Sequence, residues 1–411
     1  MIVLWDYDAN VETNLPDTPN NIVRVYPASG ANAMLPLTPA NNYTPTILLC
    51  GGQIIDDAGW GNYSYPAVDT WNIPASSRCD RITPEPTDGS APAYVQDDSL
   101  PVGRTMGQFI ALPDGTLLVM NGASNGTAGY AQRTGTTTTF AAMPFGESLA
   151  TGPVGQPAIY NPNAPPGSRW STAGLSSSNI PRLYHSSALL LPDGSVMIAG
   201  SNPNIDVNLT TVYPTTYSAE YFYPPYFSAK TRPVPQNVPT TLSYGGNYFD
   251  ITIQTSSYTG SANDAAKNAT IWLIRQGFTT HAMNMGQRIM QLNNTYTVQS
   301  NGTITLHTAQ LPPFPNLFQP GPAFLFVTIN GIPSNGTFVI VGNGQIGTQP
   351  TALASVLPLS ALSAQGSKTA NGSNGGNKNS ADPTQAMAGL TVGLLVAVAS
   401  FALSCSAMGI C

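Results

Sequence analysis

Two short segments of the chain carry a histidine, and in one of them a tyrosine precedes it. These residue types can bind a metal ion through nitrogen and phenolate oxygen. The sequence holds only three histidines. Tyr184 and His185 are adjacent and precede a Leu-Pro-Asp-Gly turn, and His281 lies in the segment 278–288. His307 lies in an alternating strand pattern, where a structural or surface role is the simpler interpretation. These segments make a metal site worth testing.

Adjacent residues such as Tyr184 and His185 point to opposite faces of a regular strand and cannot share one ligand there. An irregular backbone at the start of a strand is needed to turn both the same way. Two imidazoles with phenolate oxygens form a tetragonal N,O set, which suits Cu(II) better than zinc or magnesium. Taken singly, each histidine is more often a hydrogen-bonded structural residue, and from the residues alone that alternative stays open.

The composition predicts an all-β protein. Of 411 residues, 39 are Gly and 37 are Pro, and only 8% are charged, which is too few for helices covered with Glu/Lys pairs. The net charge is −6, and the 14 Lys and Arg residues form no basic cluster. The composition therefore excludes nucleic-acid binding as an expected function.

Three apolar strand patterns, at 46–52, 117–123 and 196–202, each end in glycine or Asn-Gly. The last two follow the Leu-Pro-Asp-Gly sequences at 112–115 and 191–194. A strand, an Asp-Gly turn and a second strand that ends in glycine are typical of a kelch-type propeller blade. We predict four or five blades within a catalytic propeller domain at 1–231, with further N-terminal blades missing from the sequence.

Alternating strand patterns after a Pro-rich boundary predict a second domain, an immunoglobulin-like β-sandwich at 232–346. Residues 347–385 are expected to form a linker rich in Ser, Gly and Asn. The last segment, 386–411, is apolar and carries no charged residue.

A polar spacer before an apolar terminal tail is typical of a glycolipid (GPI) attachment signal, with a retained transmembrane segment as the alternative. We therefore expect an extracellular protein held at the cell surface or cell wall by a GPI anchor. The N-terminus lacks the features of a signal peptide, so we interpret it as truncated.

Five motifs, in order along the chain, resemble those of the copper radical oxidases, and more closely the fungal glyoxal oxidase type than galactose oxidase. The motifs are Cys79-Asp-Arg-Ile-Thr-Pro-Glu, Asn121-Gly-Ala with Ala128-Gly-Tyr-Ala, Arg182-Leu-Tyr-His-Ser, Glu220-Tyr-Phe-Tyr-Pro-Pro-Tyr and Thr280-His-Ala-Met-Asn-Met-Gly-Gln-Arg. The resemblance covers about residues 20–345. It implies a seven-bladed kelch-type propeller followed by an immunoglobulin-like (early set) sandwich that carries a histidine loop toward the propeller axis.

The resemblance also implies roles for five residues. Cys79 and Tyr130 would form a thioether-linked Cys-Tyr radical cofactor, and Tyr130, Tyr184, His185 and His281 would bind one copper ion. Cysteine counting alone favours a different pairing, a disulfide between Cys79 and Cys50. With the thioether in place, Cys50 would be a buried free thiol.

The implied activity is oxidation of small aldehydes such as glyoxal and methylglyoxal to carboxylic acids, with dioxygen reduced to hydrogen peroxide. The catalytic residues would be Cys79, Tyr130 and Tyr184. The alternatives are a primary alcohol or sugar oxidase on the same scaffold, and a non-catalytic cell-wall propeller. The expected partners are the aldehyde or alcohol substrate, dioxygen, the membrane through the GPI anchor, and peroxide-consuming enzymes; the protein is expected to be a monomer.

Overall fold

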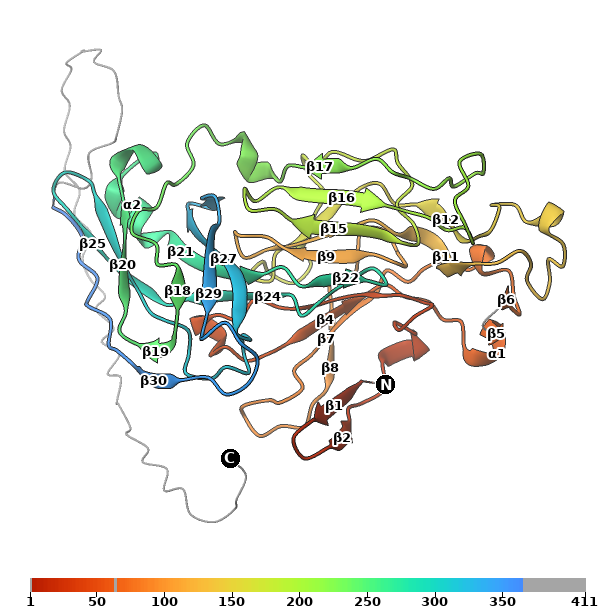
Figure 1. Ribbon diagram of the computed structural model, residues 1–411, viewed down its shortest axis with the longest axis horizontal. Coiled ribbons are helices and arrows are strands. Elements are labelled where there is room, and N and C mark those ends of the chain that lie inside the picture. The colour runs from red at the N-terminus through yellow and green to blue at the C-terminus, as the bar shows by residue number, and fades with distance from the viewer. Residues whose placement is uncertain (1, 63–64, 365–411) are drawn as a thin grey trace, which may run out of the picture. The chain divides into compact units, whose positions relative to one another are not determined.

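A computed structural model of the protein describes residues 2–62 and 65–364 (Figure 1). The α-helices in these ranges, α1 (Asp57–Trp60) and α2 (Ala262–Lys267), are short, and almost all other regular structure is strand. Short 3-10 turns lie at Pro19–Asn21, Pro39–Asn41, Thr70–Asn72, Phe140–Ala142, Pro225–Ser228 and Thr255–Ser257. The predicted all-β class is confirmed.

Three antiparallel sheets of the blade type make up most of the first half of the chain. The first has the order β3 (Ala31–Met34), β4 (Ile47–Cys50), β7 (Cys79–Ile82) and β8 (Tyr94–Asp97). The second runs β9 (Gln108–Ala111), β10 (Leu117–Met120), β13 (Ala158–Tyr160) and β14 (Trp170–Ser171), and the third runs β15 (Ser186–Leu190), β16 (Val196–Gly200) and β17 (Glu220–Phe222). Both predicted Leu-Pro-Asp-Gly hairpins are present, as β9–β10 and β15–β16.

The described part of the chain forms three such blades, so the prediction of four or five within 1–231 was wrong. The rest of this region forms separate two-stranded hairpins and loops. The hairpins are β1 (Val3–Asp6) with β2 (Val11–Asn14), β5 (Gly61–Asn62) with β6 (Tyr65–Pro66), and β11 (Ala123–Tyr130) with β12 (Ser148–Pro153). All three glycine-ended strand patterns of the sequence, at 46–52, 117–123 and 196–202, contribute a strand to one of the three blades.

The second half folds as a β-sandwich. Its larger sheet has the order β18 (Thr241–Leu242), β29 (Thr337–Val341), β27 (Gly321–Ile329), β21 (Ala269–Arg275) and β24 (Arg288–Leu292), with β28 (Ile332–Pro333) paired to β27. The facing sheet consists of β20 (Phe249–Ile253), β26 (Ile304–Thr308) and β25 (Asn294–Val298). Alternating apolar residues on both sheets fill one core between them, as expected for a sandwich.

The sandwich continues past residue 346, where the sequence predicted a linker. Strand β30 (Thr351–Ala354) pairs in parallel with β19 (Tyr244–Gly246), and Ser363 bonds to Asn263 on α2 through both its backbone N–H and its carbonyl. The composition changes at 346, but the backbone of 351–364 still finds hydrogen-bond partners on the sandwich.

The predicted attachment region and apolar tail, at 365–411, lie outside the described residues. Among the helices of the described ranges, none has the length and apolar character needed to cross a membrane.

A hairpin of β22 (Phe278–Thr280) and β23 (Met283–Met285) extends from the sandwich between strands β21 and β24. It runs beside β9 and β15 (Figure 1) and also contacts β3. Those three strands are the first strands of the three blade sheets. The sandwich thus delivers the hairpin to the place where the blades face one another, as the resemblance implied.

An apolar core holds the blades against the sandwich. Leu118, Val119 and Phe109 of the second blade belong to the same buried cluster as Trp272 and Phe326 of the sandwich. This shared core keeps the base of the hairpin in a fixed position relative to the blades.

Candidate metal centre

His281 occupies the tip of the β22–β23 hairpin. Thr280 pairs with Met283, which leaves His281 and Ala282 as a two-residue loop. Their φ angles are 52° and 62°, the left-handed values that a type I′ hairpin turn requires at both central positions. Glycine or asparagine normally fills these positions because a β-carbon is disfavoured there. The sequence instead places a histidine at the tip of the hairpin. Its unfavourable φ angle costs free energy, and such strained residues are common at functional sites.

Tyr184 and His185 lie in a turn directly before β15. His185 has a φ of 66°, and the turn is closed by the N–H of Asn202, which donates to the Tyr184 carbonyl at 2.8 Å. The two rings are stacked, with centroids 3.8 Å apart. The irregular backbone predicted from the sequence is therefore present, and it places both side chains on the same side.

Hydrogen bonds hold both imidazoles through Nδ1. His185 Nδ1 lies 2.9 Å from the carbonyl oxygen of Asn202, which can only accept, so Nδ1 carries the proton and Nε2 has a free electron pair. His281 Nδ1 lies 2.8 Å from the Thr280 hydroxyl, a group that can donate or accept. In both residues the bond at Nδ1 leaves Nε2 for a metal ion, which is the usual arrangement around metal-binding histidines.

The two histidines and Tyr184 line one hollow of about 290 Å³. Its other lining residues are Ser186, Ser187, Thr279, Thr280 and Ala282. The Ser186 hydroxyl is buried and, within the described ranges, has no hydrogen-bond partner. This buried hydroxyl thus lies in the wall of the hollow with its hydrogen-bonding capacity unused.

The donor set fits copper better than zinc or calcium. In the described part of the chain, no three His, Cys, Asp or Glu side chains gather as a metal site would require. The hollow instead offers two imidazoles and a phenol, a nitrogen and oxygen set that suits Cu(II). A copper ion held by Tyr184, His185 and His281 is consistent with the chemistry of these side chains.

Tyr26 is a residue of this cluster that the sequence analysis missed. Its ring centroid lies 5.5 Å from that of His281, nearly perpendicular, and 6.2 Å from that of Tyr184. It is far from both in the sequence and belongs to no ligand-spacing motif, so only the tertiary fold brings it here. Its one sequence signal is its place just before the first blade, ahead of Pro27.

Tyr130 lies beside the cluster at the end of β11, with its ring centroid 6.3 Å from that of Tyr184. Its ring is partly exposed and also lines a second hollow of about 490 Å³. The walls of that hollow include Tyr65, Phe140 and Arg133. Tyr130 therefore connects the candidate centre with a neighbouring space.

Burial raises the pKa of the Tyr184 phenol above its ordinary value, and its hydrogen bond with Tyr26 and the nearby phenol of Tyr130 raise it further. The phenol is therefore neutral at physiological pH in the metal-free protein. A divalent cation at the hollow would reverse this preference because it stabilises the phenolate. Binding of a metal ion through Tyr184 is thus coupled to loss of its proton.

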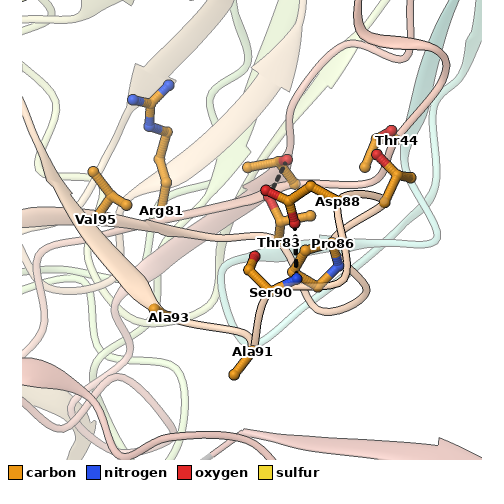
Figure 2. Close-up of a pocket in the computed structure, with 11 residues that line it drawn as sticks. Thr44, Arg81, Thr83, Pro86, Asp88, Ser90, Ala91, Ala93 and Val95 are labelled. Carbon is orange, nitrogen blue, oxygen red and sulfur yellow. Dashed lines mark hydrogen bonds between the residues drawn. The ribbon is translucent and has the colours of Figure 1, made fainter.

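A separate hollow of about 480 Å³, larger than that of the histidines, lies on the outer part of the first blade (Figure 2). Its walls carry mostly hydroxyls and small side chains, with Arg81 at one side. Arg81 is already paired with Asp97 at 2.9 Å. The hollow has no histidine or tyrosine among its lining residues, so it offers no comparable ligand set.

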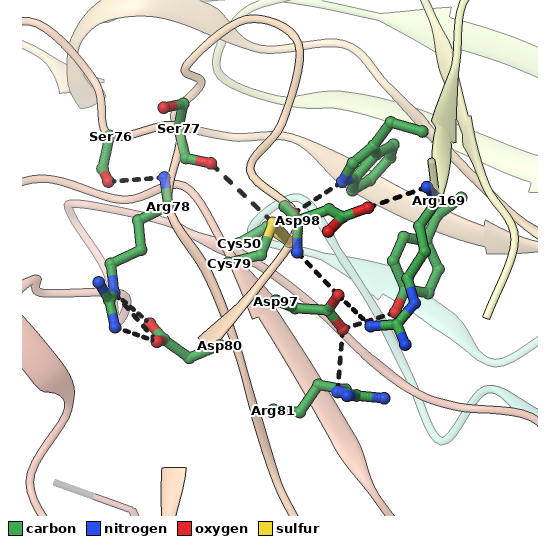
Figure 3. The surroundings of a disulfide bond; sticks show 12 residues. Cys50, Ser76, Ser77, Arg78, Cys79, Asp80, Arg81, Asp97, Asp98 and Arg169 are labelled. Carbon is green, nitrogen blue, oxygen red and sulfur yellow. Dashed lines mark hydrogen bonds and ion pairs between the residues drawn. A yellow bond between two sulfur atoms is a disulfide. The ribbon is translucent and has the colours of Figure 1, made fainter. Parts of the chain in front are cut away.

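The predicted thioether between Cys79 and Tyr130 was wrong. Cys79 is joined to Cys50 by a disulfide with a Cα–Cα separation of 4.1 Å (Figure 3). The two cysteines are directly opposite each other on β4 and β7, where their side chains leave the sheet on the same face. Both are fully buried.

Cys50 is therefore not a free thiol, and the sulfur of Cys79 has no valence left for a bond to a tyrosine ring. Within the described residues no other cysteine occurs. The pairing that cysteine counting favoured is the one that the structure contains.

Charged residues around the disulfide fix the same strands. Asp80, the neighbour of Cys79, is fully buried and accepts from Arg24 at 2.8 Å and from Arg78 at 2.7 Å. Figure 3 shows Arg78 folded back over Asp80 and Asp97 between two arginines. These ion pairs are structural, as none of their members lines the hollow of the histidines.

The third histidine is separate from the candidate centre. His307 Nδ1 lies 2.7 Å from an Asp250 carboxylate oxygen, and its Nε2 lies 2.9 Å from the Thr297 hydroxyl. Both ring nitrogens are thus engaged within the smaller sheet of the sandwich. This agrees with the structural role expected from the sequence.

Comparison with known families gives two matches along the chain. Residues 1–226 match the family described as glyoxal oxidase N-terminus, and residues 232–341 match the galactose oxidase-like early set domain.

Similar proteins occur in plants and fungi. The chain is 32% identical over 343 residues to aldehyde oxidase GLOX of Vitis pseudoreticulata, covering 82% of this chain and 58% of that protein. It is 28% identical over 292 residues to galactose oxidase of Gibberella zeae, covering 70% and 37% respectively. It thus spans little more than half the length of the first of these relatives.

Among solved structures, a fungal alcohol oxidase of the AA5 family in complex with copper superposes with a TM-score of 0.53 at 21% identity. The superposition covers 77% of this chain and 54% of that chain. It supports the arrangement of blades and sandwich.

Proposed function

The chain belongs to the glyoxal oxidase family of copper radical oxidases, and on this premise we propose that it oxidises small aldehydes to carboxylic acids, with dioxygen reduced to hydrogen peroxide. Its copper ligands in this proposal are Tyr184, His185 and His281. The observation that carries the proposal is their convergence on one hollow, with both imidazoles held at Nδ1 and presenting Nε2.

A bound copper ion would supply one-electron acceptance and would polarise the substrate oxygen. The protein's own part begins with the proton on that oxygen. Tyr184 is the ionisable side chain of the hollow whose phenolate exists only when a cation is near, so it is suited to accept this proton during turnover. Its hydrogen bond with Tyr26 would keep the phenol oxygen in place in both protonation states.

Oxidation of an aldehyde or alcohol removes two electrons, so a second one-electron carrier must be next to the metal ion. Tyr26 and Tyr130 have the oxidisable rings nearest to Tyr184. Neither has a cysteine partner in the described part of the chain, because Cys50 and Cys79 are bonded to each other. We assign the second electron to this tyrosine group rather than to a residue linked to Cys79.

Ser186 supports an aldehyde substrate. Aldehydes react in such sites as hydrates, which have two hydroxyl groups on one carbon. One of them would lose its proton to Tyr184, and the other needs a hydrogen-bond partner. Ser186 lines the hollow beside His185 and its hydroxyl has no partner among the described residues, so rotation of this side chain toward the hollow would supply that partner.

A second candidate function is oxidation of a larger primary alcohol or sugar. The observation in its favour is the second hollow beside Tyr130, whose aromatic walls include Tyr65 and Phe140. Aromatic rings of this kind provide apolar contact for a substrate body. Arg133, which lies over the ring of Tyr65 at 4.4 Å, adds a charged donor for hydroxyl groups.

The test is hydrogen peroxide release by the copper-loaded chain on glyoxal, methylglyoxal, a primary alcohol and galactose. We expect turnover of the aldehydes that Tyr184→Phe lowers by at least about 100-fold, within the range for loss of a positioned acid–base group. Tyr221→Phe, a change on the exposed outer strand β17, is the matched control and should retain activity. Equal turnover in both variants would contradict the assignment of Tyr184, and turnover confined to the alcohol or galactose would favour the second candidate.

We also propose that the protein acts outside the cell, attached to the surface by a GPI anchor, as a monomer whose peroxide is used by other enzymes. The disulfide between Cys50 and Cys79 supports an oxidising compartment. Release of the protein from cells by a phosphatidylinositol-specific phospholipase would support the anchor, while retention after treatment would favour a transmembrane tail.

A further inference from the structure

Gln108 is a fully buried polar side chain at the start of β9, the first strand of the second blade. It lies outside the five family motifs and has no part in the proposed chemistry. Its side-chain oxygen accepts from the backbone N–H of Ala188 at 2.7 Å. Its side-chain nitrogen donates to Asn284 Oδ1 at 2.9 Å and to the Thr279 hydroxyl at 3.3 Å.

These bonds use both N–H donors of the primary amide group and its oxygen, and together they span two segments. Ala188 follows His185 by three residues on β15, and Asn284 follows His281 by three residues on β23. The amide of Gln108 therefore connects the strands that directly follow the two histidines, three residues along the chain from each imidazole.

The network around Gln108 is closed, which fixes the orientation of the amide. Thr279 donates its hydroxyl to Asn284 Oδ1 at 2.7 Å, and Asn284 Nδ2 donates to the carbonyl oxygen of Phe109 at 3.0 Å. If the Gln108 amide were reversed, its N–H groups would face the Ala188 N–H and its oxygen would face Asn284 Oδ1. Both contacts would be repulsive, so a single arrangement satisfies the network.

The β22–β23 hairpin needs side-chain hydrogen bonds to fix its position. Its tip consists of two non-glycine residues with positive φ, His281 and Ala282, and His281 is exposed on the hollow. The backbone of β22 and β23 pairs only with itself, since these strands form a sheet of their own. Side-chain bonds must therefore fix the position of the hairpin against β9 and β15.

We propose that Gln108 is the positioning residue that holds the His185 and His281 segments at the separation needed for one metal ion. The role of that separation in copper binding rests on the proposed function. The hydrogen bonds of Gln108 to Ala188, Asn284 and Thr279, called the Gln108 bridge below, are a property of the metal-free protein. Supporting residues that orient metal ligands typically change metal affinity by about 10- to 100-fold when they are removed.

The test compares Gln108→Met with Gln287→Met in the full chain. Methionine keeps the length of the side chain and removes its hydrogen bonds. Gln287 is the matched control because it also joins the sandwich to β9, through the Phe109 carbonyl oxygen at 3.2 Å and the Ala111 N–H at 2.9 Å. It makes no bond to β15 among the contacts of the described residues.

The first measurement is amide hydrogen exchange in the metal-free protein, followed by mass spectrometry of peptides covering 184–190 and 278–285. Gln108→Met should speed exchange in both segments, while Gln287→Met should leave 184–190 as in the unmodified chain. If Gln108→Met speeds exchange in the hairpin alone, or in neither segment, Gln108 does not connect them and the proposal is overturned.

The second measurement is Cu(II) affinity with the electron paramagnetic resonance spectrum of the bound ion. Gln108→Met should weaken Cu(II) binding by about 10- to 100-fold. The spectrum of its bound ion should show one coordinated nitrogen in place of two. If Gln108→Met does not fold, Thr279→Val takes its place. This variant removes only one hydroxyl of the network and should change copper affinity less, in the same direction. Unchanged affinity and an unchanged spectrum in both variants would overturn the role in copper binding.

The experiments distinguish an error in the proposed function from an error in the role proposed for Gln108. If the unmodified chain does not bind copper, the proposed function is contradicted while coupled hydrogen exchange would still support the bridge. If the unmodified chain binds copper and Gln108→Met leaves exchange in both segments unchanged, the bridge is contradicted and the proposed function stands.

Discussion

The two candidate imidazoles are carried by residues whose own backbone is in an unfavourable conformation. His185 and His281 both have positive φ angles, in a region where non-glycine residues cost roughly 1–2 kcal/mol each. In both cases a hydrogen bond at Nδ1 fixes the ring. Such costs persist when surrounding contacts determine the conformation, which is common at metal and catalytic sites.

The sequence predicted three residues of the candidate centre and failed on two others for identifiable reasons. Tyr184, His185 and His281 could be named because histidine is rare in this chain and Tyr184 is adjacent to His185. Tyr26 could not, since its contacts depend on the fold of the first blade. The thioether assigned to Cys79 relied on a motif alone, whereas a disulfide requires only the register that places Cys50 opposite it.

The disulfide gives a prediction at the residue scale. Digestion of the protein without reduction should yield a peptide pair joined through Cys50 and Cys79, and treatment with dithiothreitol should separate it because thiols cleave disulfides. A thioether would resist the reductant. A linked peptide containing Cys79 and Tyr130 that survives reduction would contradict the disulfide.

At the scale of elements, the sequence was most informative where two independent turn signals coincide. Both Leu-Pro-Asp-Gly segments join adjacent strands of a blade in the predicted way. The blade count failed because it divided the length of the region by the usual length of a blade, whereas loops and two-stranded hairpins such as β11–β12 also take up part of that length. The hairpin with His281 could be placed between sandwich strands, but its docking on β9 and β15 depends on side-chain bonds that no periodic pattern encodes.

The two equivalent turns give a paired prediction. Gly115 and Gly194 have φ angles of 85° and 87°, so alanine is strained at both, by about 1–2 kcal/mol. A β-carbon at Gly115 would lie 2.5 Å from the buried ring of Trp272, whereas at Gly194 the nearest atom is 3.5 Å away.

Gly115→Ala should therefore lower the free energy of unfolding by about 1–3 kcal/mol more than Gly194→Ala, the range for overpacking a core. Chemical denaturation of both variants measures the difference. Equal losses would show that the β9–β10 turn of the second blade does not press against Trp272 of the sandwich.

At the scale of the whole molecule, blades and sandwich act as one support for the candidate centre. One buried apolar cluster includes Phe109 of a blade and Trp272 of the sandwich, and polar bonds from the hairpin reach the same blade strand. The sequence predicted the two folds, because composition and strand patterns report on each separately. Their mutual contacts depend on the shapes of surfaces far apart in the chain.

Buried phenols predict how stability depends on pH. Burial raises the pKa of Tyr244 to about 12, and its hydroxyl donates to the Phe318 carbonyl oxygen at 2.7 Å in the sandwich core. In the unfolded chain this phenol ionises near pH 10, so above that value the unfolded state loses protons that the folded state keeps. Stability should fall as pH rises from about 10 to about 12, and the contribution of Tyr244 is fully present below that range.

Urea denaturation of the protein and of Tyr244→Phe at pH 8, 10 and 11 checks this. The variant should be less stable at pH 8 by about 1 kcal/mol, the value of a lost hydrogen bond, and should show a shallower decline at high pH. A decline as steep as that of the unmodified protein would exclude Tyr244 as its source.

The most direct test of the account is a Cu(II) titration of the full chain beside three histidine variants, followed by isothermal calorimetry and electron paramagnetic resonance. We predict one equivalent of copper bound with two coordinated nitrogens. His185→Gln and His281→Gln should each weaken binding by more than the roughly 10- to 100-fold typical of supporting residues, and His307→Gln should bind as the unmodified chain does. Equal affinity in all four proteins, or loss of binding only in His307→Gln, would contradict the centre described here.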